Sequence, residues 1–388
     1  MNGNLLTDTS GIRRSMAVAG GIAVLLLGGA ALVSPQEFFR SYLYAYTFWL
    51  GAALGCLALF MLHHLVSGGW GYVIQRMTEA GMRTIPLMAL LFLPILFGAH
   101  QLYPWTEPMK GEVGITIRTG FLQIPFFVIR SVLYFIIWSG AAFVLTSWSV
   151  RQDRNGDPGI TRKIRLFSAP GLIMYVLAMT FASVDWLMSL EPGWSSTVYG
   201  FLVVVSQVLT ALGVVVISLR FLGDRPPLSH ILTERHVHQL GNLILTFVIL
   251  WAYMAYSQFI IIWSGNLPEE NLWYLHRLAP GWSSLGLFVV ITHFFLPFAL
   301  LLFRRMKRSI RALAWIAGWV LLMHIVDTFW LVAPAFHPEG IHTGLSDVIT
   351  PLALGTIWIA AYVWQLGERP LIPLRDPRFV VPAEAVGG

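Results

Sequence analysis

Cysteine is nearly absent from this chain of 388 residues, since Cys56 is the only one. A disulfide within the chain needs two thiols, an iron–sulfur cluster needs several thiolates, and covalent c-type haem needs a C-x-x-C-H run. One cysteine satisfies none of these requirements. We therefore expect no iron–sulfur cluster, no c-type haem and no structural metal site in this chain.

Charged residues are also scarce. They form 11% of the sequence, against roughly 25% in soluble domains, while apolar residues form 56%. The apolar residues gather in ten runs of about 20 residues or more, the length that crosses roughly 30 Å of hydrocarbon. The sequence thus predicts an all-α integral membrane protein with about ten transmembrane helices. The runs lie near residues 15–33, 42–66, 84–103, 119–148, 169–190, 195–221, 238–264, 282–303, 311–333 and 345–366.

The cations are distributed unevenly between the two sides of these runs. Of the 25 Lys and Arg residues, 20 fall at the termini and in the even-numbered loops. Because cytoplasmic loops are enriched in Lys and Arg, both termini are predicted to be cytoplasmic. Basic loops beside anionic lipid also explain the formal charge of +6 without a nucleic-acid partner. The sequence has no phosphate-binding glycine loop and no nucleophile elbow, so we expect no catalytic residue of those kinds.

One motif occurs twice near the outer ends of the runs. Val184-Asp185 precedes Pro192 by the same spacing as Val326-Asp327 precedes Pro334. The spans before each carboxylate can also be aligned, with Arg130 opposite His293. These repeats predict two parallel four-helix bundles plus two flanking helices, an arrangement known among membrane proteins. The predicted parts are a tail and flanking span at 1–41, bundles at 42–194 and 195–344, and a last span with a cytoplasmic tail at 345–388.

A few polar residues are predicted to lie at membrane depth, where they are costly unless paired or hydrated. Asp185 and Asp327 fall near the outer side, and His324 precedes Asp327 by one helical turn. Arg130 and His293 fall near the middle of their spans. All five are candidates for a proton path or a quinone site. The alternatives are that Asp185 simply pairs with Arg130 to hold helices together, or that His293 and His324 bind a b-type haem.

Two stretches resemble a known family. They are Ser183–Gly200, which reads SVDWLMSLEPGWSSTVYG, and Tyr256–Glu270, which reads YSQFIIIWSGNLPEE. Both are similar to the smaller integral membrane subunit of bacterial alternative complex III, a quinol:electron-acceptor oxidoreductase. That subunit belongs to the wider NrfD-like group, whose fold is two four-helix bundles with two flanking helices. Asp185 lies within the first stretch.

The resemblance implies a larger assembly in the bacterial cytoplasmic membrane. Its partners would be a multihaem cytochrome c subunit, an iron–sulfur subunit, a larger NrfD-like sister subunit and small membrane subunits, all surrounded by membrane lipid. Haem and iron–sulfur clusters would lie on those partners, and menaquinone or ubiquinone would be the quinone. The chain is then expected to contribute a quinone-binding or proton-translocation site and assembly contacts, without being catalytic when isolated. The rival interpretation is a stand-alone proton-coupled transporter that uses Asp185 and Asp327, with Pro94 and Pro297 interrupting its helices.

Overall fold

The structure is a computed structural model that describes residues 10–107 and 121–376. Within these residues it has no strand and ten helical segments long and apolar enough to cross a membrane. The predicted all-α, multi-pass membrane fold is confirmed. The principal helices are α1 (Ser10–Val33), α2 (Pro35–Val66), α3 (Gly69–Met82), α4 (Ile85–Leu90), α5 (Leu93–Phe97), α6 (Ala99–Leu102), α8 (Ile124–Asn155), α9 (Pro158–Trp186), α10 (Tyr199–Leu222), α11 (Glu234–Gly265), α12 (Pro268–Leu278), α13 (Trp282–Val289), the π-helix η5 (Val290–Phe295), α14 (Leu296–Leu302), α15 (Arg304–Arg308), α16 (Ile310–Val332) and α17 (Ser346–Leu366).

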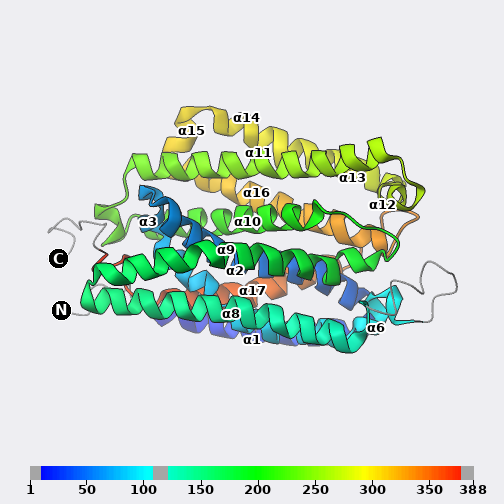
Figure 1. Ribbon diagram of the computed structural model, residues 1–388, viewed down its shortest axis with the longest axis horizontal. Helices are drawn as coiled ribbons and strands as arrows, with labels where there is room; N and C mark the ends of the chain where they lie inside the picture. The colour runs from blue at the N-terminus through cyan, green and yellow to red at the C-terminus, as the bar shows by residue number, and fades with distance from the viewer. Residues whose placement is uncertain (1–9, 108–120, 377–388) are drawn as a thin grey trace.

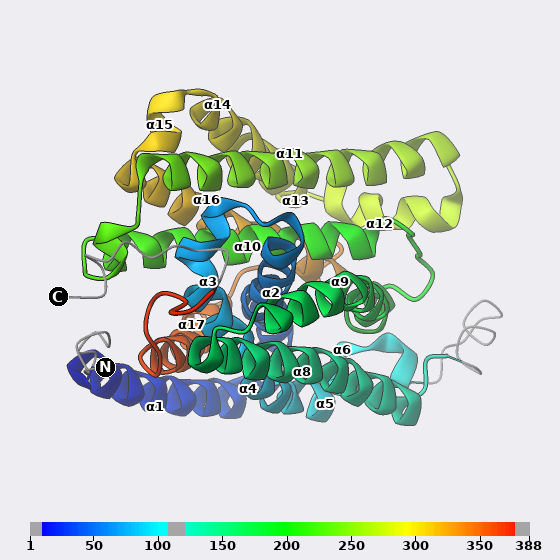
Figure 2. The same ribbon diagram turned by 60° about the vertical axis from the view of Figure 1, so that its left-hand side comes forward.

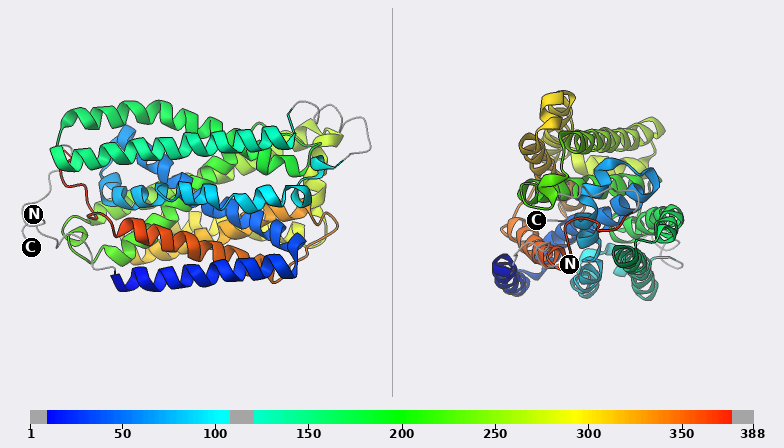
Figure 3. Two further views of the ribbon diagram at one scale, coloured as in Figure 1. Left: turned by 90° about the horizontal axis from the view of Figure 1, so that it is seen from below. Right: turned by 90° about the vertical axis from the view of Figure 1, so that its left-hand side faces the viewer.

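The long helices run roughly along the long axis of the molecule (Figure 1). The start of α1 and the end of α17 lie at the same end, together with α15 and the turn between α8 and α9 (Figures 1 and 3). We call this the basic end, because many of the cations lie in these segments. The opposite end, which holds α6 and α12, is called the aromatic end (Figure 2).

The helices pack in two groups around a central pair. The first group contains α2, α3 to α6, α8 and α9, and the second contains α10, α11, α13 to α14 and α16. The buried helices α2 and α10 join the groups along their length, and α1 and α17 pack against each other beside α2. The descent of the two groups from one duplicated bundle stays a prediction, as do the part boundaries at 42, 195 and 345.

The third span begins earlier than the sequence predicts. Helix α3 starts at Gly69 and continues into α4 and α5, whereas the apolar run starts near 84. Gln75, Arg76 and Glu79 lower the hydropathy of α3, yet all three side chains are buried. A polar helix can be buried in this way only when its charges find partners, and here the partners lie both within α3 and on α8.

Two spans are interrupted where proline removes a backbone donor. The third span is broken between α4 and α5, just before Pro94, and again at Gly98. In the eighth span the π-helix η5 directly precedes Pro297, which cannot donate to the carbonyl one turn earlier. Such π-helical turns are frequent at functional sites, and His293 lies within this one.

The contact between α2 and α10 depends on a glycine. A Cβ atom built on Gly55 would lie 2.0 Å from the carbonyl oxygen of Gln207, which is backbone and cannot move aside alone. Only glycine therefore allows the two central helices to approach this closely.

We expect Gly55→Ala to destabilise the fold by about 1–3 kcal/mol, because it forces α2 and α10 apart. The measurement is the temperature at which the purified protein loses its monodisperse peak in size-exclusion chromatography. Gly28→Ala is the matched control, since a Cβ on Gly28 meets nothing within 4 Å. Equal midpoints for the two variants would show that the close approach is unimportant for stability.

Candidate functional site

A cavity of about 690 Å³ lies in the second helix group, between α11, α12, α13 and α16. Its inner wall is buried and includes Trp251, Trp273 and Asp327. Its rim includes Tyr253, Tyr256 and Leu287, whose exposed fractions are 62%, 64% and 62%. Since these rim residues belong to membrane-spanning helices, the cavity opens toward the lipid rather than toward water. Its remaining walls are almost entirely apolar and aromatic.

Asp327 supplies the one carboxylate among the residues that line this cavity. It lies on α16, near the aromatic end, and its side chain is buried. Its Oδ2 accepts a hydrogen bond from Trp251 Nε1 at 3.1 Å. The ion pairs found between described residues do not include Asp327, so no cation neutralises it directly. A buried carboxylate with a single neutral donor is well suited to take up and release a proton.

His293 and His324 lie beside this carboxylate. The two imidazoles stack with ring centroids 5.7 Å apart and planes 12° apart, and Trp251 packs on His293 at 4.4 Å. The sequence placed His324 one turn before Asp327, and the structure brings both to the buried side of α16. Neither ring nitrogen of His293 has a hydrogen-bond partner in the described part of the chain.

One hydroxyl, that of Thr210 on α10, is hydrogen-bonded to His324. His324 Nδ1 lies 2.6 Å from Thr210 Oγ1, which donates its hydrogen to the carbonyl of Ser206 at 2.8 Å. A threonine hydroxyl carries one hydrogen, so in this arrangement His324 Nδ1 is the donor to Thr210. The exchangeable groups thus extend from the cavity toward α10.

Arg277 lines the cavity at the aromatic end. The sequence places this residue in a loop between two apolar runs, which did not indicate such a role. Its guanidinium is buried on α12 and lies 3.5 Å from the ring centroid of Trp273. It donates to Glu191 Oε1 at 3.0 Å, to the Trp273 carbonyl at 2.8 Å and to the Leu331 carbonyl at 2.6 Å. Burial lowers the pKa of this guanidinium, and the neighbouring Glu191 carboxylate opposes that effect. The arginine stays charged, because even a lowered pKa leaves a guanidinium protonated.

Asp185 has different surroundings in the first helix group. Arg130 donates to its two carboxylate oxygens at 2.8 and 2.7 Å, and the Tyr134 hydroxyl donates to Oδ2 at 2.8 Å. Arg130 also packs on Phe121, with its guanidinium carbon 3.9 Å from the ring centroid. The pairing that the sequence left open is therefore present. Asp185 is charge-compensated, whereas Asp327 is not, so the two equivalent motifs have different local chemistry.

A third polar cluster, at the basic end, was missed by the sequence interpretation. Arg76 donates to Glu79 at 2.7 Å and pairs with Asp153, and Arg369 donates to Glu79 at 3.1 Å. The hydroxyl of Ser149 donates to Glu79 at 2.7 Å. The signal that could have revealed it is the spacing of Arg76 and Glu79, which lie one helical turn apart. The cluster ties the segment after α17 to α3 and α8, and it is internally neutralised.

In the described part of the chain, no three His, Cys, Asp or Glu residues are grouped so that they could hold a metal ion.

A comparison of the sequence with protein-family models and with curated proteins found no match. The resemblance to a complex subunit therefore stays a prediction, and the geometry of the cavity carries the functional argument.

Proposed function

We propose that this protein is an integral membrane subunit of a quinol:electron-acceptor oxidoreductase complex in a bacterial electron transport chain. In this proposal the cavity beside Asp327 binds the quinone, which is menaquinone or ubiquinone. The observation that carries it is a lipid-facing, aromatic cavity with one uncompensated carboxylate at its inner wall.

The size and polarity of the cavity support a quinone. Its volume of about 690 Å³ is typical of a site that encloses a drug-sized ligand. Tyr253, Tyr256 and Leu287 form a rim at membrane depth, through which an isoprenoid tail would leave toward the lipid. Trp251 and Trp273 offer flat surfaces for an aromatic ring, and Asp327 offers the polar contact that fixes its orientation.

The groups around the cavity suit the proton chemistry of this substrate. Oxidation of a quinol releases two electrons and two protons. The Asp327 carboxylate is placed to accept a hydroxyl proton, since it faces the cavity and lacks a cationic partner. His324, one turn away on the same helix, offers a second exchangeable group and is hydrogen-bonded to Thr210.

The electrons would pass to carriers on partner subunits. The resemblance names these as a multihaem cytochrome c and an iron–sulfur protein, beside a larger sister subunit. The aromatic end would then face outward, because the basic end carries the cations of the cytoplasmic side. Docking of the partners on the outward face would place their redox groups on the same side as Asp327.

The cavity can be tested by filling it. Ala255 lines the cavity between Tyr253 and Tyr256, so Ala255→Trp should occupy the space of the ring and weaken binding of a quinone analogue at least about tenfold. Binding is measured by titrating the analogue into the complex purified in mild detergent. Ala169→Trp, at an exposed position of α9 outside the cavity, is the matched control and should bind as the wild type does. Undiminished binding in Ala255→Trp would remove the quinone from this cavity.

The rival function, a proton-coupled transporter acting alone, is favoured by one observation. The interrupted helices at Pro94 and before Pro297 are of the kind that line transporter sites. The ion pair between Arg130 and Asp185 opposes it, because one of the two coupling carboxylates is already neutralised. Proton uptake into liposomes that contain this chain alone would favour the transporter, and co-purification with haem and iron–sulfur proteins would favour the complex.

A further inference from the structure

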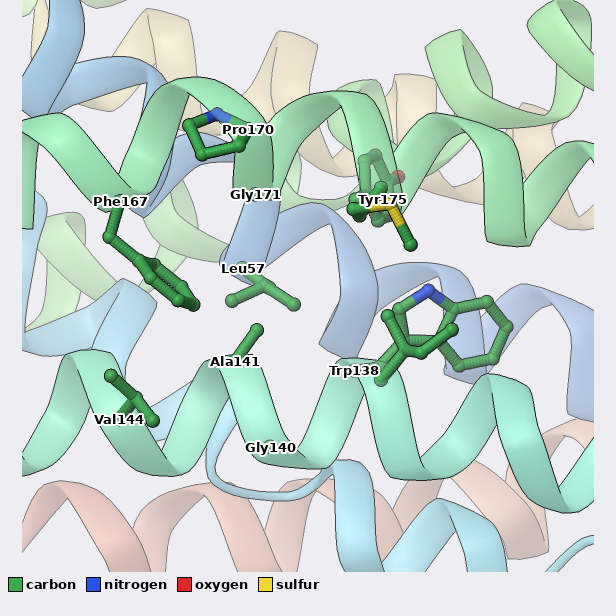
Figure 4. A pocket seen from close by; sticks show the side chains of 11 residues that line it. Leu57, Trp138, Gly140, Ala141, Val144, Phe167, Pro170, Gly171 and Tyr175 are labelled. Atoms are coloured by element: carbon green, nitrogen blue, oxygen red, sulfur yellow. The ribbon is translucent and has the colours of Figure 1, made fainter.

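A second cavity lies on the lipid-facing side of the first helix group, between α8 and α9. Its volume is about 280 Å³, and its lining is almost wholly apolar. Phe167 extends from α9 toward α8, Ala141 and Val144 face it from α8, and Leu57 of α2 lies behind them (Figure 4). Gly140, on the same wall, is exposed, and a Cβ built on it meets nothing within 4 Å. We call this space the α8–α9 groove.

The groove is bounded on each side by a regular stripe of one helix. On α9 the stripe runs through Phe167, Pro170 and Met174, which are three or four residues apart. Continued one turn toward the basic end, it reaches Lys163. The side chain of Lys163 is exposed and lies about 6 Å along the helix from Phe167.

The stripe on α8 ends in the same way. It runs through Ile137, Ala141 and Val144, and its next two positions are Trp148 and Arg151. Trp148 packs edge-on against Phe167 at 5.6 Å, as aromatic side chains do near the membrane interface. Arg151 is exposed, about 10 Å beyond Val144. Both walls of an apolar groove thus lead to a cation at nearly the same level.

Within the described residues, neither of these two cations has a hydrogen-bond or ion-pair partner. The hydrogen bonds and ion pairs found among residues 10–107 and 121–376 involve neither Arg151 nor Lys163. The nearest acid on α8, Asp153, is already paired with Arg76, and Asp157 caps α9 by accepting from Gly159 N at 2.7 Å. The tight turn at Gly156, with φ of +64°, holds the ends of the two helices together. A pair of free cations above an apolar groove is complementary to an anionic headgroup with an acyl chain.

We propose that the α8–α9 groove is a binding site for one anionic phospholipid. Its acyl chain lies in the groove beside Gly140 and Phe167, and its phosphate is held between Arg151 and Lys163. The inference is independent of the quinone cavity, which belongs to the other helix group. It assigns a ligand to the first group, where Asp185 is already neutralised.

An acyl chain fits the groove better than a partner's transmembrane helix does. A transmembrane helix with its side chains is about 10 Å across. It could lie over this groove between two packed helices without entering it, whereas an acyl chain is only one methylene wide. A partner helix also brings no obligatory anion to Arg151 and Lys163, whereas an anionic phospholipid always does.

The test measures lipid binding to the full chain with its co-purifying polypeptides, by native mass spectrometry. The probe is dioleoyl phosphatidylglycerol, with dioleoyl phosphatidylcholine as the uncharged comparison. Arg151→Gln/Lys163→Gln is expected to weaken phosphatidylglycerol binding about 30-fold, since each cation near the membrane surface contributes about fivefold. Arg162→Gln/Arg165→Gln removes the same charge from other faces of α9 and should change binding less than about twofold.

A second variant separates the acyl chain from the headgroup. Gly140→Leu adds a side chain at an exposed position of the groove wall, where a Cβ meets nothing within 4 Å, so the fold should be kept. It is expected to weaken phosphatidylglycerol binding at least about tenfold. Undiminished binding in Gly140→Leu, an equal loss in both double variants, or displacement of the lipid by inorganic phosphate alone would each overturn the proposal. So would a photo-crosslinker at position 140 that captures a polypeptide in place of lipid.

Discussion

Asp327→Asn is expected to slow quinol oxidation by the purified complex about 100-fold or more, while the quinone stays bound. Asparagine keeps the shape of the side chain and can still accept a hydrogen bond from Trp251. It cannot accept a proton at neutral pH. The replacement therefore removes only the property that the proposed function requires of this residue.

The measurement is the steady-state rate with a saturating soluble quinol, together with a binding titration of the quinone analogue. The matched control is Asp224→Asn, a carboxylate at the basic end whose side chain is 81% exposed. It should leave the rate unchanged. Normal turnover in Asp327→Asn would show that this carboxylate takes no part in the reaction, and the cavity would lose its catalytic role.

The class of fold followed from composition and run length alone. In lipid, the backbone N–H and C=O groups of a spanning segment must form their hydrogen bonds within the protein, and a helix does this by itself. An apolar run long enough to cross the membrane is therefore expected to be helical. The runs began too late where a helix carries polar residues near its start, as in α3 and α9. A hydropathy scale counts the cost of burying Arg76 and the cost of burying Glu79 separately. In the structure the two charges form an ion pair one helical turn apart, which offsets both costs.

The candidate site was predictable to the extent that it depends on position within one helix. The repeated spacing found Asp185 and Asp327, and the one-turn separation found His324. His293 stacks on His324, so two of the five candidate residues are direct neighbours. The different environments of the two carboxylates were not predictable, because they depend on which side chain of a neighbouring helix faces each of them.

The cavity and the position of Arg277 beside it also could not be predicted from the sequence. Arg277 falls between two apolar runs of the sequence, but α12 places its guanidinium between Trp273 and Glu191. A cavity is the space that several helices leave unfilled, so no single stretch encodes it. Its walls come from α10 to α16, which are far apart along the chain.

Arg130→Leu is expected to destabilise the protein by about 3 kcal/mol, because it leaves the Asp185 carboxylate buried without a cation. Asp185 is fully buried, and Arg130 provides two of the three side-chain hydrogen bonds to it. We take the lower end of the usual range for a broken buried pair, because the Arg130 side chain is 18% exposed and water can partly replace it.

The loss of stability can be measured through the reactivity of Cys56. It is the only cysteine and is fully buried, so a thiol-reactive fluorophore labels the purified chain only as it unfolds. The midpoint temperature of labelling should fall by several degrees in Arg130→Leu. Arg130→Leu/Asp185→Asn should recover most of the loss, since the carboxylate that needs the cation is also removed. A double variant as unstable as the single one would mean that Arg130 stabilises the fold through its packing on Phe121 rather than through its charge.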